Sequence, residues 1–149
     1  MNEQEIHHLL YDIPENVDYT DIPQELDLED VSKERVDKLR DLLHSDDLAV
    51  RFDAALLLTN WGVEDGLNTL IDLFEKGETK GFIPHHLHPY DDTNKHILDA
   101  LIGYWASQTD LHKEQEARKR IYPTIISIIK QAVHSAYSIA QIGFLIKKI

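Results

Sequence analysis

The sequence predicts an all-α protein, a short α-solenoid of about three antiparallel helix pairs. Apolar residues recur three and four positions apart along most of the 149-residue chain, as on the buried face of a helix. No segment has the alternation of apolar and polar residues that marks a half-buried strand. Two stretches 46 residues apart also resemble each other, and such a period is typical of stacked helical repeats.

The first 32 residues are expected to be an acidic lead-in to the main helices. Residues 3–11 predict a short helix, because their apolar side chains fall on one face. Over residues 12–31, Pro14 and Pro23 interrupt any helical period. We expect a loop laid along the surface of the domain.

Six helices are expected after the lead-in. Ser32 is placed to cap the first of them, and the turn that ends at Asp47 to cap the second. Asp92 or Thr93 precedes the fourth, and Pro123 is expected in the first turn of the fifth, where proline is tolerated. The predicted helices cover about residues 33–43, 48–61, 64–75, 93–106, 118–133 and 136–149.

The repeat is carried by RFDAALLL, which begins at Arg51, and ILDALIGY, which begins at Ile97. It divides residues 33–149 into helix pairs at about 33–61, 64–106 and 118–148. The helix that contains RFDAALLL is apolar nearly all round, which predicts that residues 54–58 belong to the core.

The stretch LRDLLHSDDLAVRFDAALLLTNWG, followed by LNTLIDLF, resembles a HEAT repeat. It has an amphipathic helix, a turn containing aspartate, Val50 and Arg51 at the start of the second helix, and an Ala/Leu-rich second helix. The resemblance implies that Asp47 and Arg51 stabilise the turn, and that residues 1–149 form one HEAT-like domain. It also implies a scaffold for protein binding, although a fold alone does not specify a function.

The net charge of −12 is concentrated in the lead-in. Residues 1–32 carry ten acidic side chains and no lysine or arginine, while all 15 basic residues lie later, beside the other 17 acidic ones. Such a charge repels nucleic-acid phosphates and anionic lipids and attracts a basic partner. A solvated segment that aids solubility is the alternative interpretation.

The absence of cysteine excludes disulfides and thiolate chemistry and fits a reducing compartment. The first residues, MNEQEIHHLL, lack the basic start and apolar run of a secretory signal. No stretch approaches the roughly 18 apolar residues of a membrane helix. We therefore expect a cytoplasmic protein that binds neither membranes nor nucleic acid.

The densest group of ionisable side chains lies in the connection 77–92. His85, His86 and His88 are suitable zinc ligands, but their spacing matches no standard metal site. The sequence leaves open whether this loop binds a metal, contacts a partner through Tyr90 or is simply polar.

No catalytic motif stands out. The chain has neither a GxSxG motif nor a glycine-rich phosphate loop. Asp53 and Asp99 occupy equivalent repeat positions and could pair, but hydrogen bonds to a neighbouring helix or turn explain them more simply. We expect no cofactor and no enzymatic activity.

These features favour a small acidic inhibitor of a basic protein. In size, charge and helical-repeat character the chain is similar to the all-helical immunity proteins of contact-dependent growth inhibition and related polymorphic toxin systems. This resemblance implies that acidic side chains fill the substrate cleft of an RNase or DNase toxin, with complementary charge speeding association. The expected partner contacts are Asp12, Glu15, Asp18, Tyr19, Asp21 and Glu25 in the lead-in and Tyr90, Asp91 and Asp92 in the loop.

Two other functions stay open. A HEAT-like adaptor in a larger assembly would need no toxin, and a HEAT-like lyase acting on a protein-bound chromophore would need a substrate site. DNA-acting relatives of such folds need a basic groove, which the charge disfavours. The apolar ending FLIKKI makes a monomer or a weak dimer the expected state, because a terminal repeat without a polar face needs a cap or partner.

Overall fold

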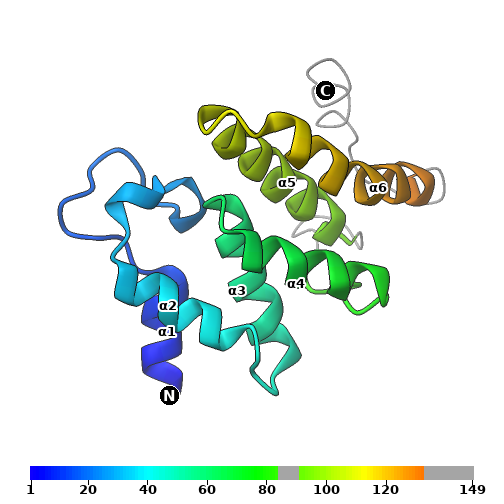
Figure 1. Ribbon diagram of the computed structural model, residues 1–149. Coiled ribbons are helices and arrows are strands. Elements are labelled where there is room, and N and C mark those ends of the chain that lie inside the picture. Colours follow the sequence, from blue (N-terminus) through cyan, green and yellow to red (C-terminus); the bar gives the residue numbers. More distant parts are fainter. Residues whose placement is uncertain (84–90, 133–149) are drawn as a thin grey trace.

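The computed structural model describes residues 1–83 and 91–132, and its regular secondary structure within these ranges is helical (Figure 1). The predicted all-α class is therefore confirmed. The α-helices are α1 (Glu3–Tyr11), α2 (Lys33–Leu42), α3 (Leu48–Asn60), α4 (Glu64–Glu75), α5 (Thr93–Asp110) and α6 (Glu114–Ala132). Two 3₁₀ turns, η1 (Pro23–Glu25) and η2 (Leu28–Asp30), lie between α1 and α2.

Side-chain caps begin three of these helices. Asn2 accepts a hydrogen bond from the Glu5 N–H at the start of α1, and Ser32 accepts one from the Arg35 N–H at the start of α2. Asp47 Oδ1 accepts from the first N–H groups of α3, at 3.0 and 3.4 Å. The predicted caps at Ser32 and Asp47 are confirmed, and each satisfies donors that the helix itself leaves unpaired.

The expected role of Arg51 in this turn is not supported. Its side-chain Nε is buried and has no hydrogen-bond partner in the part of the chain that the structure describes. The Arg51 backbone N–H only closes the first turn of α3 on the Asp47 carbonyl, at 3.0 Å. Asp47 is therefore the residue that shapes the turn.

Helix α3 is the centre of the core. It contacts α1, α2, α4, α5 and η1, and Phe52 and Leu58 on it have no exposed surface. The prediction that residues 54–58 are core is confirmed, because all five are buried. A fully buried side chain of this kind contributes roughly 1.5–3 kcal/mol relative to an exposed one.

The helices associate differently from the predicted pairs. The most extensive contacts join α3 to α4, α3 to α5 and α5 to α6, whereas α4 and α5 share no extensive contact. The predicted pair at 64–106 is therefore wrong: α3 packs on both of its members. The helix expected after His134 lies outside the described residues.

Glycines allow α3, α4 and α5 to approach closely. Gly62 has φ +83°, and a Cβ there would lie 2.2 Å from Ser107 Oγ on α5. A Cβ on Gly66 of α4 would lie 2.4 Å from Leu58 Cβ on α3. These contacts fix the carboxyl end of α3 against the carboxyl-terminal turns of α5.

Helix α6 begins earlier than expected, and Pro123 lies inside it rather than in its first turn. A short connection through Leu111 and His112 follows α5, and His112 has φ +59°. Residues 114–117 lie before the predicted helix, yet Glu, Gln and Ala are all good helix formers. Among the described residues, no helix is both long and apolar enough to cross a membrane.

Candidate functional site

The acidic segment, residues 12–31, is held on the helices by a few buried anchors. It forms the long blue connection between α1 and α2 in Figure 1. Leu26 and Val31 are 4% and 8% exposed and belong to the core. Trp61, at the end of α3, donates its indole N–H to the Pro23 carbonyl at 2.9 Å. The segment is therefore tied to the helical scaffold rather than trailing from it.

Hydrogen bonds within the segment fix its course. The Tyr19 hydroxyl donates to Asp30 Oδ2 at 2.8 Å and accepts from the Asp27 N–H at 2.9 Å. The Thr20 hydroxyl donates to Glu25 Oε2 at 2.8 Å. Tyr19 was expected to contact a partner, but its hydroxyl is committed inside the chain. The residue as a whole is still 50% exposed.

The other contact residues expected in the lead-in all face solvent: Asp12, Glu15, Asp18, Asp21 and Glu25 are exposed. Asp12 Oδ2 lies 2.8 Å from His8 Nδ1. Two apolar side chains of the same segment, Ile22 and Leu28, are 46% and 42% exposed. The surface of the segment thus combines carboxylates with uncovered apolar groups.

A groove of about 660 Å³ lies between the acidic segment and the carboxyl ends of α3 and α5. Figure 1 places these elements on one side of the molecule, where the α3–α4 and α5–α6 turns approach the blue segment. Its acidic lining residues are Glu25, Asp27, Glu29 and Asp110, and its larger apolar ones are Leu26, Leu28, Trp61 and Leu111. Within residues 1–83 and 91–132, no lysine, arginine or histidine lines it.

Two helix ends add to the negative potential of this groove. Asn60 ends α3 and Asp110 ends α5, and neither helix has a basic residue in its last turn. The carboxyl end of a helix carries a partial charge of about −0.5. The lining carboxylates and the two helix ends therefore both favour the binding of a cation.

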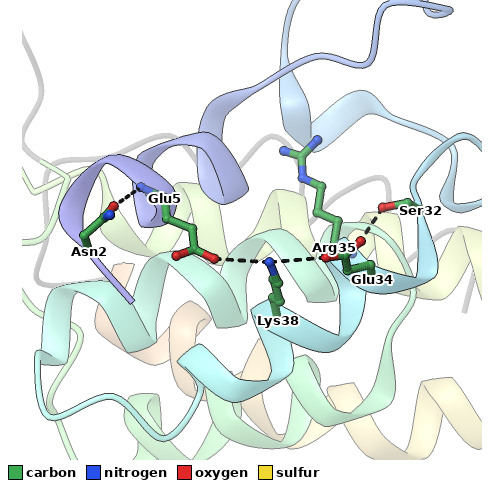
Figure 2. Close-up of polar contacts among 6 residues, drawn as sticks. All are labelled: Asn2, Glu5, Ser32, Glu34, Arg35 and Lys38. Atoms are coloured by element: carbon green, nitrogen blue, oxygen red, sulfur yellow. Dashed lines mark hydrogen bonds and ion pairs between the residues drawn. The ribbon is translucent and has the colours of Figure 1, made fainter.

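A second groove, of about 570 Å³, lies between α1 and the start of α2 and already contains its own cations. Figure 2 shows Lys38 between Glu5 and Glu34, with N–O distances of 3.1 and 3.3 Å. Arg35 donates from Nε to the Leu9 carbonyl at 2.9 Å, and its guanidinium carbon lies 5.4 Å from the centre of the Trp61 ring. Burial lowers the pKa of Arg35, and the nearby Asp12 opposes that shift. These groups join α1 to α2 and to α3, which is a structural role.

Asp91 and Asp92, two of the contacts expected in the loop, do not line the groove beside α3 and α5. Asp91 and Asp92 precede α5, whereas the groove lies at the other end of this 18-residue helix, about 27 Å away at 1.5 Å per residue. Asp91 and Asp92 therefore lie away from the groove. His85, His86, His88 and Tyr90 lie outside the described residues.

Asp91 stabilises its own loop through hydrogen bonds. It accepts hydrogen bonds from the Gly81 N–H at 2.8 Å and from the Thr93 N–H and hydroxyl at 3.0 and 2.5 Å. Partial burial favours its neutral form, but these hydrogen bonds outweigh burial and hold the pKa of Asp91 below its ordinary value. Asp92 takes the cap position of α5 without a side-chain cap bond.

Over residues 1–83 and 91–132, no group of three or more histidine, aspartate or glutamate side chains is arranged to hold a metal ion. Asp53 is half-buried and lies 3.4 Å from the Tyr11 hydroxyl, which matches the hydrogen-bonding role that the sequence favoured. Burial is the main cause of its raised pKa.

Sequence reasoning missed the part of the groove that α3 and α5 contribute. Trp61 is not among the predicted contact residues, and Asp110 and Leu111 lie between the predicted helices 93–106 and 118–133. A signal was present at Asp110, because α5 ends on a carboxylate, where the helix dipole favours a cation. The approach of these residues to the lead-in depends on tertiary packing.

Comparisons with known proteins give no relative: no family model, no curated protein and no solved structure matches this chain. The fold and the surface together define an all-helical protein with an acidic segment fixed along one side.

Proposed function

We propose that this chain is a protein-binding module that neutralises a basic bacterial nuclease toxin by occupying its substrate cleft. The observation that carries the proposal is the combination of ten acidic side chains in residues 1–32, no lysine or arginine there, and anchors that hold the segment in place. A cleft that binds phosphates is basic, so a fixed row of carboxylates matches its charge.

The anchors favour binding over solubility as the purpose of the acidic residues. A segment needed only for solubility would not need Trp61 and Tyr19 to fix its backbone. It would also not need to expose Ile22 and Leu28, since uncovered apolar groups lower solubility. At a protein interface, the same groups supply contact area surrounded by polar residues.

The mechanism is steric and electrostatic. Complementary charge accelerates encounter with the toxin, and apolar contacts then slow dissociation. Bound carboxylates take the place of the phosphate backbone, so the toxin cannot hold its substrate. No chemical step by this chain is required.

The test is protection of bacterial cells that express a nuclease toxin domain encoded beside the gene for this chain. We expect the intact protein to restore growth and the double variant Asp18→Lys/Asp21→Lys to fail, because both side chains are exposed and unpaired within the described residues. The matched control is Glu75→Lys/Glu78→Lys, which changes the net charge equally at the far end of α4. Equal protection by both double variants, or none by the intact protein, contradicts the proposal.

The alternative is a HEAT-like adaptor, and the same cells distinguish it. An adaptor would bind a partner of a larger assembly and would leave toxin activity unchanged.

A further inference from the structure

We propose that the groove between the acidic segment and the carboxyl ends of α3 and α5 receives an arginine or lysine side chain of the protein partner. This inference rests on the proposed function, and it places the centre of the interface with the protein partner at this groove. The groove volume of about 660 Å³ exceeds what one such side chain needs, which leaves room for neighbouring residues of the partner.

The first argument is a charge imbalance. Four carboxylates line the groove, and among the residues that the structure describes no cationic side chain does. The groove between α1 and α2 differs, since Lys38 and Arg35 already sit among its carboxylates. The groove between α1 and α2 thus has its own cations, whereas the described residues supply none to the groove beside α3 and α5.

The second argument is the position of Asp110. A carboxylate at the carboxyl end of a helix faces the negative end of the helix dipole, where a cation would be favoured. Asp110 occupies such a position at the end of α5, without a basic residue in the last turn. The arrangement is unfavourable in the isolated protein and becomes favourable when a cation binds.

The third argument is the chemistry of the walls. Leu28 and Leu111 are 42% and 60% exposed and line the groove on its two sides. Arginine and lysine carry an apolar stem below a charged head, and such stems pack on apolar surface. The leucines therefore match the stem, and the carboxylates and helix ends match the head.

The direct test is a nuclear magnetic resonance titration with N-acetyl-arginine amide and N-acetyl-lysine amide, with N-acetyl-norleucine amide as the uncharged control. We expect the cationic probes to shift the backbone amides of Gly62, Gly103 and Gln108, which line the groove, and the norleucine probe to leave them in place. Shifts spread evenly over the acidic segment, or equal shifts with all three probes, overturn the inference.

Variants give a second measurement. Asp110→Asn and Glu29→Gln each remove one charge from the groove, and we expect each to weaken arginine-amide binding about threefold, as for a partly exposed charge pair. Glu78→Gln removes one charge after α4 and should leave binding unchanged. Asp110→Asn should also raise the melting temperature by about 1–3 °C, since it relieves the conflict with the helix dipole. A lower melting temperature, or an equal effect of Glu78→Gln, contradicts the assignment.

The two proposals can fail separately. If a nuclease toxin binds the chain but the double variant Asp110→Asn/Glu29→Gln binds it equally well, the groove assignment is wrong and the proposed function stands. If the arginine probe binds in the groove but the chain neutralises no nuclease toxin, the proposed function is wrong and the cation site stands.

Discussion

Replacing Trp61 with phenylalanine tests how the acidic segment is attached to the helices. Trp61 is 3% exposed, and its indole N–H is hydrogen-bonded to the Pro23 carbonyl at 2.9 Å. The guanidinium of Arg35 lies over the same ring, 5.4 Å from its centre. Phenylalanine keeps an apolar ring at this position but has no N–H donor.

The expected loss of unfolding free energy follows from these contacts. A net hydrogen bond contributes about 1 kcal/mol. A cation–π contact contributes about 0.5–1 kcal/mol, and the phenylalanine ring retains part of it. Trp61→Phe should therefore lower the free energy of unfolding by about 1–2 kcal/mol, before any repacking of the smaller ring.

The assay is urea unfolding followed by circular dichroism, combined with amide hydrogen exchange. The amides of Leu26 and Val31 are bonded within η1 and η2, at 3.2 and 3.0 Å. They should exchange faster in Trp61→Phe, because the segment loses its tie to α3. Trp105→Phe is the matched control, since the half-buried Trp105 makes no side-chain hydrogen bond within the described residues. A loss below about 0.5 kcal/mol, or unchanged exchange of both amides, would refute the attachment described here.

Three further predictions concern the scaffold. Gly62→Ala should cost about 2–4 kcal/mol in urea unfolding, because it combines a positive φ with a Cβ placed 2.2 Å from Ser107 Oγ, and a wild-type midpoint would disprove that close approach. Gly66→Ala should cost about 1–3 kcal/mol despite alanine's better helix propensity, because its Cβ would lie 2.4 Å from Leu58 Cβ; a gain in stability would show that α4 has room to move. The pKa of Asp53 is raised, chiefly by burial, so ionising this carboxyl destabilises the folded state above that pKa. Asp53→Asn should therefore raise the urea midpoint near pH 7 and lose this advantage as the pH falls toward about 3.5; an advantage that stays constant with pH would contradict it.

The helices could be predicted from sequence because their signals are local. Ser32 and Asp47 cap helices as expected, and the helix from residue 48, which is apolar nearly all round, is the core element of the fold. Local propensity also explains the main error: Pro123 was expected to start a helix, yet the good helix formers before it extend α6 back to Glu114.

The candidate site was predictable in charge but not in shape. The exposure of Asp18 and Asp21 follows from their polarity. The groove depends on Gly62 at a positive φ and on the close approach of α3 to α5, contacts between residues more than 40 positions apart. The distance between Asp92 and the groove could not be predicted from sequence either, because it depends on the path of α5.

The most direct test of the central claim is the dissociation constant of the intact protein for the nuclease toxin domain encoded beside its gene, measured at rising salt concentration. Because the acidic segment faces the solvent as a row of carboxylates, we expect binding that weakens from about 50 to about 300 mM salt, as the Debye length shortens. The double variant Asp18→Asn/Asp21→Asn should bind more weakly at low salt and depend less on salt. Absence of binding, or an affinity that neither salt nor these substitutions change, would contradict the account.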